Sequence, residues 1–444
     1  MTTTAHRGPH VAVIGGGFAG LSAAWQLAQH GVEVTLLEAE PQLGGLAANF
    51  EAGGEQLERF YHHWFLSDTD VLKWAADLGL ASAVTVRPTR TAVYHGHRLL
   101  RLSTPWDLLT FRPLRFADRL RLARLMLRVR RLSDWSTLDS RSARDWLLEL
   151  GGPEVYRVVW EPLLKGKFGA DAERISAVWM WNKLKLRGGS RGRRGEERLA
   201  YLSGGFSRLS DAAARSIGER GGRVRLETAV SAITPAGDGW SVECGAERLH
   251  VDAVLLTPAP AVVAGLIERW AAAAEVAKLR RIRYLANLCL VLELDRALTD
   301  SYWLNINDPD FPFVGVIEHT NFESASSYGG RHVVYLSRYL PVEDPLWSMP
   351  ADEVLEYAWK HLTRLFPQLE RASLLRHHVW RARWAQPIVE AGYRELIPAT
   401  SGTWPGLYLC NMAQIYPEDR GTNQAVRDGR RVGDLIARDL QRSP

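Results

Sequence analysis

Three glycines near the N-terminus have the spacing with which a backbone loop binds phosphate. Gly15, Gly17 and Gly20 stand in the run GGGFAG, which matches G-x-G-x-x-G, and Phe18 and Ala19 complete the loop. Gly15 allows a tight turn, Gly17 lets the backbone approach a pyrophosphate without a Cβ, and Gly20 lets the following helix pack closely. The N–H groups and positive dipole at the start of that helix would hold the phosphates. The run therefore predicts a dinucleotide-binding loop.

The elements predicted around this loop are those that such a site requires. Residues 11–14 (VAVI) form a continuous apolar run, typical of a parallel strand buried on both faces. Residues 21–30 predict a helix, and residues 32–37 predict a second strand, which is followed by Glu38 and Ala39. Glu38 lies 18 residues after the last glycine of the loop, where a carboxylate accepts ribose hydroxyls. A glycine turn that binds no ligand would not require a strand, a helix and an acidic residue at these positions.

A second run with candidate catalytic residues is LERFYHHWFLSD, residues 57–68, which contains His62 and His63. Because successive side chains of a strand point to opposite faces, at most one of the two should face a bound cofactor. The alternative places one histidine in the core and the other in solvent. No carboxylate or cysteine stands at ligand spacing from them, so we expect no metal site.

The C-terminal residues predict a second part of the same site. Residues 406–410 predict a short apolar strand, and Asn411 follows it. Residues 425–440 predict an amphipathic helix, with four residues facing inward: Val426, Val432, Leu435 and Ile436. Three residues at the start of this helix are candidates for cofactor contacts: Gly421, Thr422 and Asn423.

The loop before this helix, YPEDRG, holds two further candidate catalytic residues, Tyr416 and Arg420. Arg420 is placed to hold an anionic group of a substrate. The alternative is a surface salt bridge from Arg420 to Glu418 or Asp419.

Residues 201–260 predict a helix and several strands that return the chain to the first sheet. A glycine turn at 204–205 leads into a helix that ends at 221–222. Strands are predicted at 224–226 and 240–244, near Val230, and in the run DAVLLTP, which contains Thr257. By itself this stretch would be an ordinary β-hairpin unit.

A glycine doublet, Gly44–Gly45, followed by Leu46, resembles the doublet of the FAD-dependent amine oxidase, protoporphyrinogen oxidase and phytoene desaturase superfamily, which includes UDP-galactopyranose mutases. The resemblance covers residues 10–60, 200–260 and 405–440. It implies FAD as the cofactor, with the doublet beside the pyrophosphate. The arginines that are usual around the doublet are missing from this chain.

The resemblance also implies roles for individual residues. The strand near Val230 would present backbone to the adenine, and Asn411 would contact the ribityl chain or phosphate, a place usually filled by aspartate. The start of the last helix would lie at the pyrimidine end of the flavin ring, where its dipole stabilises negative charge on the reduced flavin.

Two functions fit this cofactor. The first is a redox enzyme that moves a hydride from a lipophilic, lipid-linked or ring-bearing substrate to flavin N5. The second is a non-redox enzyme of galactopyranose-mutase type, because His63, Trp64 and Phe65 match a run in those enzymes, although His62 replaces its proline and GGLA differs from their GGN. A flavin-carrying scaffold without catalysis would be a third class.

The order of these segments predicts an α/β fold: a Rossmann-like FAD-binding domain with a parallel sheet, an interleaved α+β substrate domain and a helical insertion. The FAD-binding domain would be assembled from residues 8–65, 200–265 and 401–444. The helical insertion would be residues 66–199, and the substrate domain residues 266–400.

A basic amphipathic helix is predicted within residues 112–132, which begin at Arg112 and end at Leu132. On a helical wheel Arg121, Arg124, Arg128 and Arg131 share one face, and Leu122, Leu125, Val129 and Leu132 form the adjoining face. Such a helix either lies on an anionic membrane surface or is an ordinary helix with a solvated basic face. The arginine-rich run at 187–194 is either a solvated loop or a phosphate site.

The composition sets broader limits. With 444 residues and a net charge of +5 but no nucleic-acid motif, the chain predicts a small-molecule or lipid-linked substrate and no nucleic acid. Three distant cysteines predict neither disulfides nor a metal cluster. No apolar leader precedes the first strand, so we expect a cytoplasmic protein, in contact with the inner face of the membrane if the basic helix binds there. The sequence carries no signal for an oligomeric state.

Overall fold

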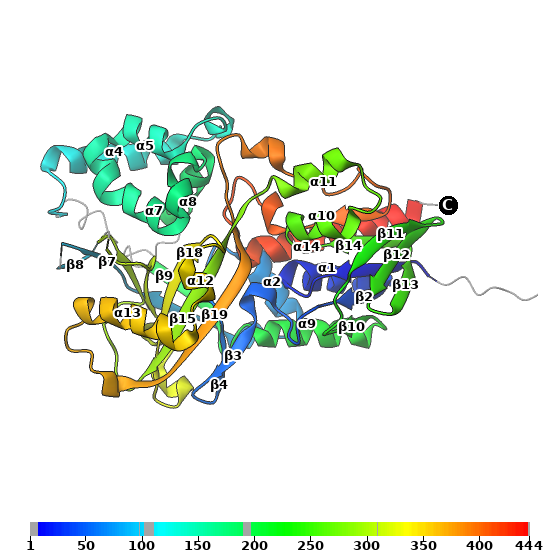
Figure 1. Ribbon diagram of the computed structural model, residues 1–444, viewed down its shortest axis with the longest axis horizontal. Coiled ribbons are helices and arrows are strands. Elements are labelled where there is room, and N and C mark those ends of the chain that lie inside the picture. The colour runs from blue at the N-terminus through cyan, green and yellow to red at the C-terminus, as the bar shows by residue number, and fades with distance from the viewer. Residues whose placement is uncertain (1–7, 97, 102–110, 190–196, 309, 443–444) are drawn as a thin grey trace, which may run out of the picture.

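The computed structural model describes residues 8–96, 98–101, 111–189, 197–308 and 310–442. Three groups of elements are visible in Figure 1: a parallel sheet with its helices at the right, a long-stranded sheet with α13 at the lower left, and a bundle of helices above that sheet. The arginine-rich run predicted at 187–194 lies mostly outside the described residues. Among the described residues, no helix is both long and apolar enough to cross a membrane.

The first sheet is fully parallel and brings together three distant stretches of the chain. Its order is β10 (Arg223–Arg225), β2 (Glu33–Leu37), β1 (His10–Ile14), β14 (Ala253–Leu256) and β20 (Leu407–Leu409). All four pairings are parallel. Strand β1 is buried along its whole length, as the apolar run VAVI predicts. The predicted α/β fold with a parallel sheet is confirmed.

The first and last helices pack tightly against each other beside this sheet. Helix α1 spans Phe18–Gln29 and α14 spans Thr422–Arg442. A Cβ on Gly429 would lie 2.3 Å from the carbonyl oxygen of Ala19, so the two backbones touch where only glycine fits. On α14, Val426, Val432 and Ile436 are buried, whereas Leu435 is only partly buried. Helix α9 (Ser207–Glu219) also packs on α1.

A three-stranded antiparallel sheet follows, formed by β11 (Ala232–Ala236), β12 (Gly239–Cys244) and β13 (Glu247–Val251). Helices α10 (Pro260–Ile267) and α11 (Ala273–Arg280) come after β14. The strand expected near Val230 begins only at Ala232, and Val230 itself lies in the irregular segment before it.

A seven-stranded mixed sheet forms the second layer. Its order is β19 (Leu374–Pro387), β15 (Tyr284–Leu294), β18 (His332–Leu340), β17 (Gly315–Glu318), β16 (Trp303–Ile306), β7 (Thr91–His95) and β8 (Arg98–Arg101). Helix α13 (Ala351–Leu365) covers one face, where it packs on Val334 and Leu336 of β18. Because side chains alternate along a strand, Tyr335 and Tyr339 of β18 point to the other face.

The helical group has its own apolar core and consists mainly of α4 (Phe116–Arg131), α5 (Ala143–Gly151), α7 (Glu161–Phe168) and α8 (Ala177–Gly189). The remaining longer elements connect the layers: β3 (Asn49–Ala52), β4 (Glu55–Glu58), β5 (Trp64–Phe65), α2 (Thr69–Asp77), β6 (Val84–Thr89) and β9 (Glu197–Leu202). The division of the chain into five segments stays a prediction. Strands β7 and β8 pair with the seven-stranded sheet, although they fall within the stretch predicted as the helical insertion.

Candidate flavin and substrate site

The glycine loop joins the end of β1 to the start of α1. An added Cβ would meet different surroundings at each of its glycines. A Cβ on Gly20 would lie 1.9 Å from the carbonyl oxygen of Gly15, which is a severe clash. Gly15 has a φ of +103° and packs against Thr257, whose hydroxyl donates to the carbonyl of Ile14 at 2.8 Å. By contrast, a Cβ on Gly17 would have no protein atom nearer than 4.0 Å. An added Cβ at Gly17 would therefore meet no close protein atom, which agrees with a loop whose backbone must come close to a phosphate.

The glycine doublet lies against this loop. Gly44 forms a bridge with Gly17, and its N–H donates to the carbonyl of Gly16 at 2.8 Å. Gly44 and Gly45 have φ values of +106° and +57°, and Leu46 follows partly exposed. The two glycine runs, which are separated by a strand and a helix in sequence, thus form one surface.

Glu38 closes the other side of the loop. Its carboxylate accepts from the N–H of Gly16 at 2.6 Å and from the N–H of Glu40 at 2.9 Å. Its backbone carbonyl accepts from Thr228 at 2.8 Å, which brings the segment leading to Val230 alongside. Ala39, the next residue, is exposed. The predicted ribose and adenine contacts therefore lie next to each other.

Asn411 follows β20 at the carboxyl edge of the same parallel sheet. Its side-chain oxygen accepts from the N–H of Ala413 at 3.1 Å. Its Nδ2 is buried and has no hydrogen-bond partner among the described residues. Since buried donors are nearly always bonded, this amide fits a ligand that brings an acceptor, such as a ribityl hydroxyl or a phosphate oxygen.

The start of α14 is fixed by the segment around β5. Trp64 donates from Nε1 to the hydroxyl of Thr422 at 2.8 Å, and the N–H of Val71 donates to the side chain of Asn423 at 3.0 Å. Both side chains are thus used within the protein. What Gly421 and the first turn of α14 offer a cofactor is their backbone N–H groups and the helix dipole.

The two histidines lie in irregular chain before β5, so the strand geometry expected for them was wrong, yet their side chains do diverge. His63 pairs through Nδ1 with the hydroxyl of Tyr302 at 2.9 Å. His62 pairs through Nδ1 with the carbonyl oxygen of Phe60 at 2.6 Å. Burial lowers the pKa of His62 to about 4, and the positive charge of Arg420 also lowers it. His62 is therefore neutral, and because Nδ1 donates to a carbonyl, its Nε2 is an acceptor.

Arg420 does not form the surface salt bridge that was the alternative for it. Its Nε donates to Gln386 at 3.1 Å and its Nη2 to the hydroxyl of Tyr339 at 2.8 Å. Glu418 instead pairs with Arg427, and Asp419 accepts from the indole of Trp179 at 3.0 Å. Arg420 thus has two neutral partners on the sheet face that carries Tyr339.

Tyr416 is placed differently from the other candidate catalytic residues. Its hydroxyl donates to the carboxylate of Asp139, and its ring packs edge-on against Trp135 at 5.5 Å between centroids. These partners belong to the helical group, so the structure does not bring Tyr416 together with His62, His63 and Arg420 in direct contact.

Sequence reasoning missed several residues that meet at this place. Tyr61 packs edge-on against Trp303 at 4.9 Å and near Tyr335 at 6.3 Å. Lys167 and Lys183 lie 3.1 Å and 2.6 Å from the carboxylate of Asp419. A signal was present, because only seven of the 55 basic residues are lysines and four of these fall at 165, 167, 183 and 185.

The carboxyl group of Glu58 is buried close to the segment that holds His62 and His63. It accepts from the N–H of Phe206 at 2.6 Å and from the hydroxyl of Tyr201 at 3.0 Å, and it is 1% exposed. Burial raises its pKa from an ordinary 4.5 to about 7, against the lowering effect of these two hydrogen bonds. Phe206 in turn stacks on Trp64, which follows His63 in the chain. Through this contact Glu58 helps to hold the segment of His62 and His63 in place.

Replacing Glu58 with glutamine is expected to make the protein more stable at pH 8 than the wild type, with only a small difference near pH 5. The folded protein keeps a proton on Glu58 that the unfolded chain releases between pH 4.5 and about 7, so the free energy of unfolding falls as the pH rises through that window. The shift corresponds to about 3 kcal/mol, which glutamine avoids. Urea unfolding at pH 5 and pH 8 measures the free energy of unfolding of both proteins. A difference between wild type and variant that does not change with pH would contradict this prediction.

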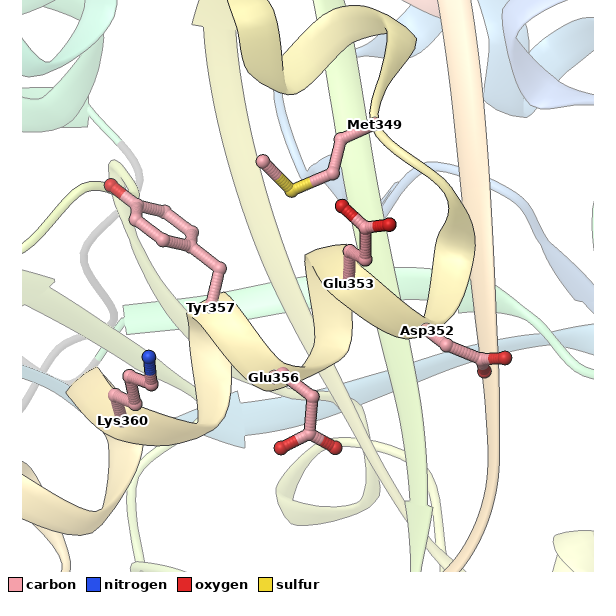
Figure 2. A pocket seen from close by; sticks show the side chains of 6 residues that line it. All are labelled: Met349, Asp352, Glu353, Glu356, Tyr357 and Lys360. Atoms are coloured by element: carbon pink, nitrogen blue, oxygen red, sulfur yellow. The ribbon is translucent and has the colours of Figure 1, made fainter.

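A shallow pocket of about 280 Å³ lies on α13 and is lined by Met349, Asp352, Glu353, Glu356, Tyr357 and Lys360 (Figure 2). Helix α13 covers the face of the seven-stranded sheet opposite to Tyr335 and Tyr339. The pocket is therefore separate from the site described above. Among the described residues, no group of three or more His, Cys, Asp or Glu side chains is arranged to hold a metal ion.

The chain is similar to known proteins in sequence and in fold. Residues 18–437 match the family described as flavin containing amine oxidoreductase. The chain is 26% identical over 178 residues to coproporphyrinogen III oxidase of Propionibacterium freudenreichii subsp. freudenreichii, covering 38% of this chain and 33% of that protein. It is 29% identical over 200 residues to zeta-carotene desaturase of Zea mays, covering 39% and 35%. These matches thus span about a third of each relative's length.

Solved structures match over nearly the whole chain. A candidate protoporphyrinogen oxidase from Exiguobacterium sp. 255-15 superposes with a TM-score of 0.77 at 19% identity, covering 98% of this chain and 99% of the other. Cyclohexylamine oxidase from Brevibacterium oxydans IH-35A does so with a TM-score of 0.72 at 17% identity, covering 98% and 100%. At these identities the likeness shows the fold. Nothing in these matches favours a galactopyranose mutase.

The glycine loop, the doublet, the unpartnered Asn411 amide and the start of α14 all fit the resident cofactor of this family. The family match covers most of the chain. This chain therefore belongs to the flavin containing amine oxidoreductases, enzymes that use FAD.

Proposed function

We propose that this chain is an FAD-dependent oxidoreductase that removes a hydride from a lipophilic, lipid-linked or ring-bearing substrate. The observation that carries the proposal is that Arg420, two residues before the first turn of α14, bonds Tyr339 of the seven-stranded sheet and lies near Tyr61. Bound FAD would supply a hydride acceptor at N5, and oxygen or another acceptor would then be needed to reoxidise it.

The cofactor would be held by the residues that the sequence predicts. The loop from Gly15 to Gly20 and the doublet would hold the pyrophosphate through backbone N–H groups. Glu38 would accept from the ribose, and the segment at Val230 would meet the adenine. Asn411 and the N–H groups at 421–423 would contact the ribityl chain and the flavin ring. Each assignment is supported by the adjacency described above.

The substrate would be bound by aromatic and polar side chains of this chain. Tyr61 and Trp303 pack edge-on and are both partly exposed, and this aromatic pair favours a large apolar or ring-bearing molecule. The names of two relatives, coproporphyrinogen III oxidase and zeta-carotene desaturase, refer to molecules of that kind. Neutral His62 would accept a hydrogen bond from the substrate at Nε2, since its Nδ1–H is used by Phe60.

The redox function is tested by mixing the oxidised holoenzyme with candidate porphyrinogens, carotenes and amines without oxygen. Bleaching of the flavin by one of them, with release of the dehydrogenated product, is the expected result. Turnover that occurs only after dithionite reduction, with no net oxidation of a sugar substrate, would instead establish the mutase-type function.

We also propose that α4 contacts the surface of an anionic membrane. Leu122, Leu125 and Val129 face the core of the helical group. On the opposite face Phe116, Leu120 and Leu127 are 65%, 38% and 52% exposed, and their spacing of four and seven residues places them in one stripe. Exposed arginines flank the stripe: Arg124, Arg128 and Arg131. An apolar stripe between cations suits the headgroup region of anionic lipids.

The double substitution Phe116→Ser and Leu127→Ser is expected to weaken binding to phosphatidylglycerol vesicles by at least about 10-fold, because two apolar side chains no longer enter the bilayer. Cosedimentation with vesicles measures it. Leu375→Ser, which changes a side chain 53% exposed on β19, is the matched control and should bind like the wild type. Equal binding of all three proteins would contradict the proposed contact.

A further inference from the structure

An arginine reaches the segment that carries the glycine doublet. Arg59 directly follows β4, and its N–H donates to the carbonyl of Ala48 at 2.9 Å. From its side chain, Nε donates to the carbonyl of Asn49 at 3.2 Å, and Nη2 donates to the side-chain oxygen of Gln42 at 3.1 Å. Residues 42 and 49 lie on either side of the doublet and of the short helix at 45–47 that follows it. The guanidinium therefore bridges the two ends of the turn that the doublet makes.

Arg59 has no ion-pair partner among the residues that the structure describes. Two other arginines of the FAD-binding half do have one: Arg225 pairs with Glu247 at 2.6 Å, and Arg430 pairs with Asp77 at 3.4 Å. Both hydrogen bonds of the Arg59 guanidinium go to neutral oxygens. Three of its five N–H groups thus have no acceptor within the described part of the chain. Arginine stays protonated in proteins, so this side chain can still bind an anion.

An aromatic ring of the seven-stranded sheet holds the same guanidinium in place. Its central carbon lies 4.7 Å from the ring centre of Trp380 on β19. Phe50 of β3 packs against that ring at 5.4 Å between centroids, and Figure 1 shows β3 and β4 beside β19. Arg59 as a whole is half-buried. Because the ring and the two hydrogen bonds already fix the planar group, little side-chain entropy remains to be lost when it binds an anion.

We propose that Arg59 binds the pyrophosphate of FAD from the side of the doublet and supplies positive charge to it. The pyrophosphate carries two negative charges, whereas the start of α1 offers backbone N–H groups and a dipole worth about half an elementary charge. The carboxylate of Glu38 on the other side of the loop adds negative charge. A charge-assisted hydrogen bond from Arg59 would offset part of this excess. The inference rests on the proposed placement of the pyrophosphate at the two glycine runs.

Titration of the apoprotein with FAD, followed by flavin fluorescence, tests the inference. Arg59→Met removes the charge but keeps an unbranched side chain over Trp380, and it is expected to bind FAD at least about 10-fold more weakly. Arg59→Lys keeps the charge and should bind FAD more tightly than Arg59→Met. Raising the salt from about 0.05 M to about 0.5 M should weaken FAD binding more in the wild type than in Arg59→Met. Arg371→Met is the matched control, because Arg371 lies over Trp359 of α13 at 4.9 Å, and it should bind FAD like the wild type.

Two results would overturn the inference. One is an Arg59→Met protein that binds FAD as tightly as the wild type. The other is equally weak binding by Arg59→Met and Arg59→Lys with the salt dependence of the wild type, which would give Arg59 a structural role only. Gly17→Ala separates this inference from the placement of the pyrophosphate: if it weakens FAD binding and Arg59→Met does not, only the role of Arg59 is refuted, whereas unchanged affinity in both refutes the placement itself. Circular dichroism shows which variants are folded, and Arg59→Gln takes the place of Arg59→Met if that protein is not.

Discussion

Replacement of Gly17 by alanine is expected to leave the protein folded and to weaken FAD binding by roughly 100-fold or more, about 2.7 kcal/mol. Gly17 has an ordinary φ of −72°, and an added Cβ would have no protein atom nearer than 4.0 Å, so the fold can accept it. The methyl group would instead occupy the place where the backbone approaches the pyrophosphate. Titration of the apoprotein with FAD, followed by flavin fluorescence, measures the change.

Two further glycines provide the comparison. Gly218 of α9 also has open space around it, so Gly218→Ala should bind FAD like the wild type. Gly20→Ala should lose stability as well as FAD, because its Cβ would lie 1.9 Å from the carbonyl oxygen of Gly15. Unchanged FAD affinity in the Gly17→Ala protein would mean that the phosphates are bound elsewhere.

Replacement of Asp419 by asparagine is expected to lower the free energy of unfolding by about 3–5 kcal/mol, since it removes a buried carboxylate that two lysines contact. Lys167, Lys183 and Arg420 would then repel one another without the carboxylate between them. The loss should also loosen the link between α8 and the loop before α14. Urea unfolding of the holoprotein, monitored by tryptophan fluorescence, measures the free energy of unfolding.

The matched control is Glu154→Gln. Glu154 pairs with Arg157 at 2.7 Å, but both side chains are more than half exposed, so the loss should be much smaller than that of Asp419→Asn. Equal stability losses in the two variants would show that the cluster at Asp419 is solvated and carries no special energy.

The nucleotide-binding half of the molecule could be predicted from sequence because its signals are local. The loop from Gly15 to Gly20, the strand before it and Glu38 lie within 30 residues, and each residue type there has its own steric or hydrogen-bonding reason. The pairing of the N-terminal and C-terminal segments followed from the resemblance, and the packing of α1 on α14 agrees with it.

The substrate side could not be predicted in the same way, because its residues meet only in the folded chain. Asp419 contacts Lys167, which is 252 positions away, and Arg420 contacts Tyr339, which is 81 positions away. No local pattern encodes such a pairing. The histidine segment shows the same limit: a strand was expected at His62 and His63, but the described strand has only two residues and begins after them.

The central claim is that the N-terminal glycine loop and the start of α14 hold one FAD together, although they lie some 400 residues apart in sequence. Hydrogen–deuterium exchange of the apoprotein and the FAD-loaded protein tests it most directly. The backbone amides of residues 15–20, 44–46 and 421–425 should all gain protection when FAD binds. Protection that appears at only one of these segments, or at neither end of the chain, would contradict the claim.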